Sequence, residues 1–261
     1  MFFNDTPILV YHQITPGNPS KNLGDFAISA SQFERQMRYL SEHGYVSLPL
    51  TELLRKSDKR RLLRRRAVVL TFDDSHEDFF TVAYPILRGF NFMATVFVVT
   101  KRIRGKSDLE RDVYGQYMTW EQIEALQKWG ISFGSHTCTH PKLPHLSREE
   151  IWRELAGSKE CLEARLGQEI KWLAYPYGVS TSEIQRMAEV VGYKAAFGVS
   201  RGRSSRFNIW RRLCRRDDTL MTFALRLNHW YHYVGHLRED TEVGRFLRKV
   251  KHRIGFRERL R

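Results

Sequence analysis

The chain has 261 residues, of which 42% are hydrophobic and 13% aromatic, and its formal net charge at pH 7 is +14. This length is sufficient for one large domain with a full core. No run approaches the roughly 18 apolar residues that span a bilayer, and three cysteines without paired spacing predict no disulfide framework. Because residues 1–7 lack the apolar segment of a signal peptide, we expect a cytoplasmic protein or one at the inner membrane face.

The chain begins with short apolar segments separated by glycine-rich turns. Pro7–His12 is predicted to be a buried strand that ends in a histidine, and Ser31 begins a helix that ends at Gly44. Tyr45–Leu48 is a further strand candidate, and a helix is expected from about Thr51. His12 is a candidate catalytic residue, although a strand-end histidine bonded to a loop carbonyl is the commoner case.

Ala67–Asp74 is an apolar, β-branched run that ends in two carboxylates, Asp73 and Asp74. Such runs are typical of buried strands in α/β proteins, whose ligands bind at the carboxyl ends of the strands. Two adjacent side chains point in different directions from an extended backbone, so one carboxylate can bind a metal while the other accepts a proton. The alternative is that they only cap the helix expected to follow through Leu87.

A second strand-like stretch, Ile131–His136, continues into Thr-Cys-Thr-His140. His136 and His140 are four residues apart, which places both imidazoles on one side of a helical turn or tight loop. Two imidazoles and a carboxylate form a common ligand set for catalytic Zn²⁺. Cys138 lies between them and is expected to point away, so it is left out of the site.

Strands and helices alternate along most of the chain. Ala94–Val99 is the strand before a polar excursion over residues 101–116, and Thr119 and Ser147 open helices with capping boxes. Further strands are expected at residues 172–176, 195–199 and 207–214, with helices over residues 180–191 and 220–234. This alternation predicts a parallel α/β architecture, most simply a barrel.

Three motifs, Thr71-Phe-Asp-Asp74, Ser135-His-Thr-Cys-Thr-His140 and Tyr175-Pro-Tyr-Gly178, resemble those of the polysaccharide deacetylases, the family 4 carbohydrate esterases. The resemblance runs from Pro7 to about Leu213 and is strongest for the branch that acts on poly-N-acetylglucosamine. It implies a single-domain, distorted (β/α)7 barrel, with the catalytic barrel over residues 1–215. Residues 216–261 would form a basic helical extension.

The resemblance also implies roles for individual residues. Asp74, His136 and His140 would hold a divalent metal, most simply Zn²⁺, with Co²⁺, Ni²⁺ or Fe²⁺ as alternatives. Asp73 would be the general base, the backbone N–H of Tyr177 the oxyanion donor, and His12 the general acid. Aromatic side chains are candidates for stacking on sugar rings, although a place in the core is the commoner case for each of them: Trp120, Trp210 and Trp230.

Two positions depart from the family pattern. An arginine that orients the base commonly precedes the Pro-Tyr motif, where this chain has Ala174 and Tyr175. Arg211, or failing that Arg212, is the expected replacement, because the final strand would bring an arginine inward. Ser75 stands where glycine is usual, and its hydroxyl is expected to be tolerated while narrowing the cleft.

The expected function is metal-dependent removal of N-acetyl groups from amino sugars, as polymers or as lipid-linked units. Alternatives are an amidase or deformylase acting on a small substrate, and a non-catalytic protein that binds carbohydrate or lipid. Basic residues cluster at 55–66 and 245–261, where they favour an anionic membrane surface over specific nucleic acid, or form only a solvated surface. Apolar residues spaced helically from Val243 predict a tail helix that packs on the barrel or lies on a membrane.

Overall fold

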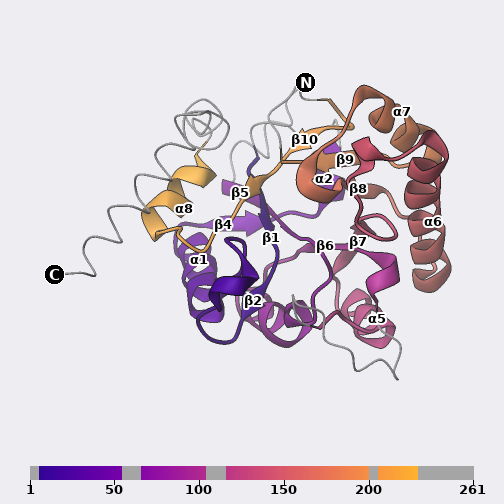
Figure 1. The fold of residues 1–261 in the computed structure, drawn as a ribbon. Coiled ribbons are helices and arrows are strands. Elements are labelled where there is room, and N and C mark those ends of the chain that lie inside the picture. The colour runs from indigo at the N-terminus through magenta and orange to yellow at the C-terminus, as the bar shows by residue number, and fades with distance from the viewer. Residues whose placement is uncertain (1–5, 55–65, 104–115, 200–204, 229–261) are drawn as a thin grey trace.

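The computed structural model describes residues 6–54, 66–103, 116–199 and 205–228, which form a nearly closed barrel of parallel strands surrounded by helices (Figure 1). The neighbouring strands follow the order β10-β9-β8-β7-β6-β5-β1-β11, and every pairing among them is parallel. The strands are β1 (Ile8–Tyr11), β5 (Arg66–Phe72), β6 (Thr95–Val98), β7 (Ser132–Ser135), β8 (Trp172–Ala174), β9 (Ala195–Gly198), β10 (Ile209–Trp210) and β11 (Arg212–Leu213).

One short segment closes the barrel. Ile209 of β10 pairs with Phe197 of β9, and three residues later Arg212 of β11 pairs with Leu9 of β1. The predicted strand over residues 207–214 is therefore divided between the two edges of the sheet. Counted as one strand position together with β1 and β5 to β9, this segment gives the seven positions of the expected (β/α)7 barrel, which is confirmed.

Nearly all residues of the barrel strands are buried, with Arg66 at the start of β5 exposed, because helices cover the outside of the sheet. Val68, Leu70 and Phe72 of β5 belong to the main core, whereas Val69 packs in a second cluster with Ile8 and Phe97. Near-continuous apolar sequence is what this two-sided burial requires. Three smaller strands complete the sheets: β4 (Tyr45–Ser47) pairs with β5, and β2 (Ile14–Thr15) pairs with β3 (Ile28–Ser29).

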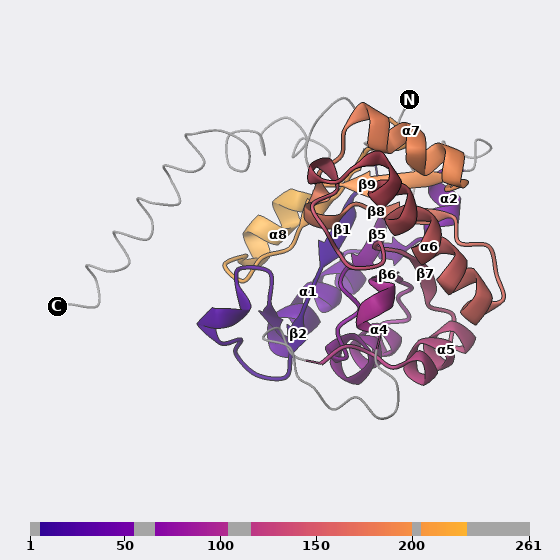
Figure 2. The ribbon, with the colours of Figure 1, turned by 45° about the vertical axis from the view of Figure 1, so that its right-hand side comes forward.

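Helices cover the outside of the barrel (Figure 2). They are α1 (Ala30–Glu42), α2 (Leu50–Leu54), α4 (Tyr84–Gly89), α5 (Trp120–Lys128), α6 (Arg148–Leu166), α7 (Ser182–Val191) and α8 (Leu220–Leu227). Both predicted capping boxes form: the Thr119 and Ser147 hydroxyls each accept a hydrogen bond from the backbone N–H three residues on, and the Gln122 and Glu150 side chains accept one from the backbone N–H of Thr119 and Ser147.

The segment between Asp74 and Leu87 does not form the single regular helix that the sequence predicted. The chain first turns through Phe79–Ala83 with π-helical hydrogen bonding, and the regular helix α4 begins only at Tyr84. Asp73 and Asp74 therefore do not cap a helix directly, and the alternative that they serve only as caps does not hold.

Among the described residues, no helix is long and apolar enough to cross a membrane. The basic residues at 55–65 and 245–261, the predicted tail helix and Trp230 lie outside the described residues. The boundary expected between a barrel at 1–215 and an extension at 216–261 stays a prediction, although α8 packs on α1 through a contact between Phe223 and Tyr39.

Candidate active site

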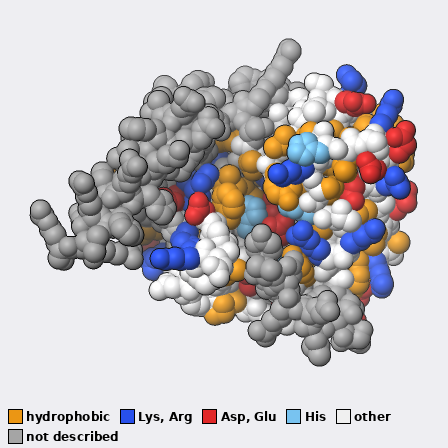
Figure 3. Space-filling model, viewed as in Figure 1, with side chains coloured by type: hydrophobic (Ala, Val, Ile, Leu, Met, Phe, Trp, Pro, Cys, Tyr) orange, Lys and Arg blue, Asp and Glu red, His pale blue; other side chains and the backbone are white. Residues whose placement is uncertain are grey.

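The carboxyl ends of the strands surround a pocket of about 360 Å³ that opens at the surface as a hollow with histidine and acidic side chains at its base (Figure 3). His12 comes from the end of β1, Asp73 and Asp74 follow β5, and His136 and His140 follow β7. Parallel strands bring their carboxyl ends to the same rim, so residues far apart in sequence meet there.

The two aspartates lie at a sharp turn. The backbone N–H of Asp73 still donates to Tyr11 of β1 at 3.0 Å, whereas Asp74 and Ser75 have left-handed φ values of 70° and 57°. This turn sends the two carboxylates in different directions, as the sequence predicted. Ser75 is buried and accepts a hydrogen bond from the backbone N–H of Val99, so the expectation that it narrows the cleft is wrong.

His136 and His140 lie in a tight loop, which decides between the two geometries left open by their spacing. His140 and Thr137 have left-handed φ values of 63° and 69°. The Nδ1–H of His136 donates to the carbonyl of Ala174 at 2.8 Å, which leaves Nε2 directed toward the aspartates. Cys138 is turned toward α6, as expected, and its thiol donates to the Arg153 carbonyl.

Glu154, on α6, holds this loop and was missed in the sequence. Its carboxylate accepts hydrogen bonds from the backbone N–H groups of Cys138 and Thr139 at 2.8 and 2.9 Å, and from the Thr139 hydroxyl at 2.7 Å. No motif marks Glu154, because it lies on a charged helix surface where acidic residues are common.

Asp74, His136 and His140 form a site that fits a metal ion. One ligand atom from each lies within 4.8 Å of the others, and Asp74 Oδ1 is 3.6 Å from His136 Nε2 and 3.3 Å from His140 Nε2. Asp74 Oδ1 is also buried without a hydrogen-bond partner among the described residues. A buried carboxylate oxygen without a donor, facing two imidazoles, is the chemistry that a divalent cation satisfies.

Electrostatics favour the protonation states that a metal requires. Burial alone would raise the pKa of Asp74, but His12 and His136 overcome this effect and lower it. Burial and the neighbouring His136 lower the pKa of His140 to about 4. Asp74 is therefore ionised and His140 neutral at pH 7, as ligands must be.

Arg211 makes a bidentate ion pair with Asp73, with both nitrogen–oxygen distances at 2.7 Å. Burial would raise the pKa of Asp73, but the guanidinium of Arg211 reverses this effect and lowers it. The alternative, Arg212, points to the other side of the strand and donates to the Arg226 and Asn228 carbonyls. Of the two candidates left open by the sequence, Arg211 is thus the one that contacts Asp73.

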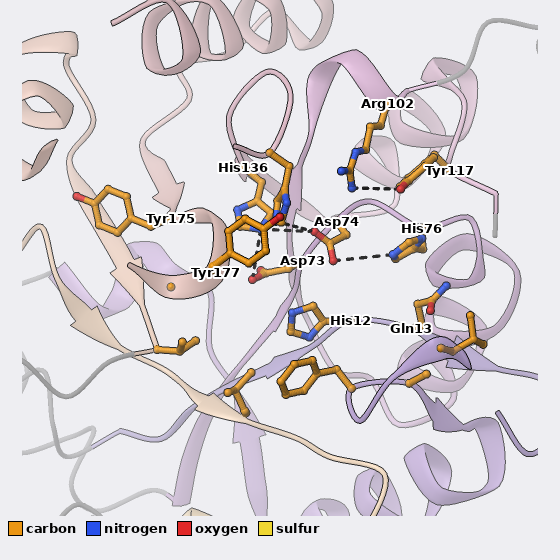
Figure 4. Close-up of a pocket in the computed structure, with 17 residues that line it drawn as sticks. His12, Gln13, Asp73, Asp74, His76, Arg102, Tyr117, His136, Tyr175 and Tyr177 are labelled. Carbon is orange, nitrogen blue, oxygen red and sulfur yellow. Dashed lines mark hydrogen bonds and ion pairs between the residues drawn. The ribbon is translucent and has the colours of Figure 1, made fainter. Parts of the chain in front are cut away.

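His12 lies in the pocket beside the aspartates (Figure 4). Its ring stacks on Phe26 at a centroid distance of 5.0 Å. Burial lowers the pKa of His12, while the charges of Asp74 and Asp73 act in the opposite direction.

Tyr177 forms the opposite side of the pocket. Its φ is 58° and its side chain is 55% exposed, with the ring 4.8 Å from that of His140. The next residue must be glycine, because a Cβ on Gly178 would lie 2.1 Å from a Val199 methyl group. The Pro-Tyr-Gly turn is closely packed, as expected, and the oxyanion donor at Tyr177 stays a prediction.

A third wall contains residues that the motifs did not identify. The His76 ring stacks on Tyr117 at 5.0 Å, and its Nε2 lies 3.9 Å from Asp74 Oδ2. Arg102 donates to the Tyr117 hydroxyl at 3.1 Å. His76 lies two residues after Asp74 in the sequence, so its closeness to that motif could have identified it. Arg102 and Tyr117 come near the aspartates only in the folded chain. Of the tryptophan candidates, the two in the described part of the chain do not line the pocket: Trp120 is partly buried against the core and Trp210 is 9% exposed.

The model of the family described as polysaccharide deacetylase matches residues 61–196. The chain is 31% identical over 202 residues to a putative polysaccharide deacetylase of Bacillus subtilis, a match that covers 77% of this chain and 66% of that protein. It is 26% identical over 215 residues to the poly-beta-1,6-N-acetyl-D-glucosamine N-deacetylase of Staphylococcus aureus, with coverages of 75% and 72%.

Solved structures have the same fold. The Streptococcus pyogenes deacetylase PplD, determined in complex with acetate, superposes with a TM-score of 0.75 and 27% identity over 85% of this chain and 98% of that one. IcaB from Ammonifex degensii superposes with a TM-score of 0.71 over 86% of this chain and 97% of that one, at 22% identity, which supports the fold alone.

Proposed function

The chain belongs to the polysaccharide deacetylase family, and from that premise we propose that it is a hydrolase that removes N-acetyl groups from amino sugars. The observation that carries the proposal is the meeting, in one pocket, of Asp73, which pairs with the buried Arg211, of the Asp74, His136 and His140 set, and of His12. A base, a cation site and an acid are the three parts that amide hydrolysis requires.

Asp74, His136 and His140 are proposed to hold a divalent cation, with Zn²⁺ first among the metals that suit one carboxylate and two imidazoles. When bound, the cation would polarise the amide carbonyl and favour ionisation of the attacking water. The Nδ1 bond of His136 to Ala174 orients that imidazole, and Glu154 binds the backbone of the loop that leads to His140.

Asp73 is proposed to accept the proton of the attacking water. Both of its oxygens bind Arg211, which keeps the carboxylate ionised and fixes its plane. Attack places negative charge on the carbonyl oxygen, where the backbone N–H of Tyr177 would donate. As the carbon–nitrogen bond breaks, His12 in its protonated form, which the charges of Asp74 and Asp73 favour against burial, would donate its proton to the leaving amine, so that one water is consumed and acetate and an amine are formed.

Acetate release from β-1,6-linked N-acetylglucosamine oligomers tests this proposal, because a relative of this chain is named for that polymer. We expect release that requires an added divalent metal and that Asp73→Asn abolishes. Glu183→Gln, on the exposed surface of α7, is a matched control that should keep wild-type activity. Metal binding without release from any N-acetyl sugar would refute it and leave a small amide or a non-catalytic binding role.

Arg102 favours a second candidate, an amino sugar joined to an anionic group such as the phosphate of a lipid-linked or nucleotide-linked unit. Arg102 lines the pocket, and among the described residues its side chain bonds only to the neutral Tyr117 hydroxyl, with no acidic partner. We expect N-acetylglucosamine 1-phosphate to have a lower KM than its methyl glycoside, and Arg102→Gln to remove that difference. Equal KM values for the two sugars would exclude this candidate.

A further inference from the structure

The imidazole of His12 is positioned differently from that of His136 in the same pocket. His136 is oriented by a hydrogen bond from Nδ1, the arrangement usual for a functional histidine. His12 Nδ1 is buried and has no hydrogen-bond partner among the described residues. The contact that defines its ring plane is the stack on Phe26, with 24° between the planes.

Phe26 lies on a loop, residues 20–27, that contributes Leu23, Phe26 and Ala27 to the lining of the pocket. Two consecutive arginines hold this loop from the other end of the chain. The guanidinium of Arg215 lies over the Phe26 ring, 5.3 Å from its centroid. The guanidinium of Arg216 donates to three loop carbonyls, those of Ser20, Gly24 and Ala27, at 2.8, 2.7 and 3.3 Å.

The backbone of Arg216 also binds this loop: its N–H donates to the Asp25 carbonyl at 2.8 Å. A guanidinium that bonds several carbonyls of one loop restricts the conformations of that loop, since each of its donors has a fixed direction. Phe26, between the Asp25 and Ala27 carbonyls, is therefore held on both sides.

Both arginines immediately follow the segment that closes the barrel. Arg211, five residues before Arg216, binds Asp73 from the same segment. We propose that Phe26 is a positioning residue that orients His12 for proton donation. The stretch from Arg211 to Arg216 then positions both catalytic groups: it binds the base, Asp73, directly, and it orients the acid, His12, through Phe26. This inference rests on the proposed function, in which His12 is the acid.

The proposal is tested by comparing an amide with an activated ester. Cleavage of an N-acetyl sugar requires protonation of the departing amine, whereas p-nitrophenyl acetate releases an anion that needs no acid. We expect Phe26→Leu to lower kcat for the N-acetyl oligomer about tenfold or more, a part of the 10²–10⁴-fold that acid catalysis contributes. KM and the rate on the ester should stay within about twofold of wild type, and Phe26→Tyr, which keeps the ring, should restore the amide rate.

Two further comparisons distinguish a loss of His12 positioning from a general loss of structure. Phe90→Leu is the matched control, because Phe90 is also partly buried beneath an arginine, Arg38, but lies outside the pocket. In the His12→Ala background, Phe26→Leu should cause no further loss on the amide, since the residue that it positions is gone. If Phe26→Leu does not fold, Arg216→Met should give the same amide-specific loss by releasing the loop.

Equal losses on amide and ester would overturn the positioning role, as would a wild-type amide rate in Phe26→Leu. If His12→Ala itself left the amide-to-ester ratio unchanged, the acid assignment would fail and this inference with it. A wild-type protein that cleaves the ester but no N-acetyl sugar would instead refute the proposed function, so the two failures are distinguishable.

Discussion

Replacing Arg211 by methionine removes the partner of the most deeply buried charge in the site. Asp73 is 4% exposed and Arg211 1% exposed, and two hydrogen bonds of 2.7 Å join them. Breaking a buried pair by removing one member costs about 3–5 kcal/mol, because the other charge is left without compensation. Since domains are stable by about 5–15 kcal/mol, Arg211→Met should lower the urea midpoint substantially.

The same change should alter the pH dependence of catalysis. Burial raises the pKa of Asp73 and Arg211 lowers it, so that the carboxyl lies below its ordinary pKa in the folded wild type. A depressed carboxyl pKa stabilises the fold above the unfolded value of about 3.9, and this contribution is lost as the pH falls through the folded value. Without Arg211 burial prevails, the pKa rises, and the acidic limb of kcat/KM should move to higher pH.

Arg212→Met provides the control, because Arg212 is equally buried but faces α8. It should destabilise the protein and leave the acidic limb where it is in the wild type. Unfolding in urea and a pH profile of acetate release, measured on both variants, complete the experiment. If Arg211→Met kept the wild-type acidic limb, or if both variants shifted it equally, the proposed hold of Arg211 on the base would be wrong.

Three further results are expected. Glu154→Gln, measured by calorimetric metal titration, should weaken binding about 10–100-fold, because it loses a charged acceptor that supports the ligand loop; unchanged affinity would contradict this. Gly178→Ala should lower stability in urea by at least about 1–2 kcal/mol, since the position combines a φ of 69° with the contact to Val199. In metal-free protein, the His140 ring protons should titrate near pH 4, which NMR can follow, and the fold should lose stability as the pH falls from about 6.5 toward that value. Titration of His140 at its ordinary pKa would refute the assigned burial effect.

Local sequence patterns were sufficient to predict most of the helices and strands, and the motif residues that line the pocket. Apolar runs that end in polar residues identified β1, β5 and β7, and the capping boxes identified the starts of α5 and α6. These signals succeed because burial and capping are decided within a few residues of sequence. The π-helical turn at Phe79–Ala83 was missed, since its hydrogen bonding depends on how the chain packs after the turn at Asp74.

The sequence by itself determined which strand ends carry the candidate site residues, because a parallel barrel gathers the carboxyl ends of its strands at one rim. It left open which of two adjacent arginines faces inward. Only the closure of the barrel between β9 and β1 decided that Arg211 contacts Asp73, 138 residues away in the chain. The contacts of Phe26, Arg102 and Glu154 were likewise decided only by the tertiary structure, because each joins segments whose approach depends on packing and on no local pattern.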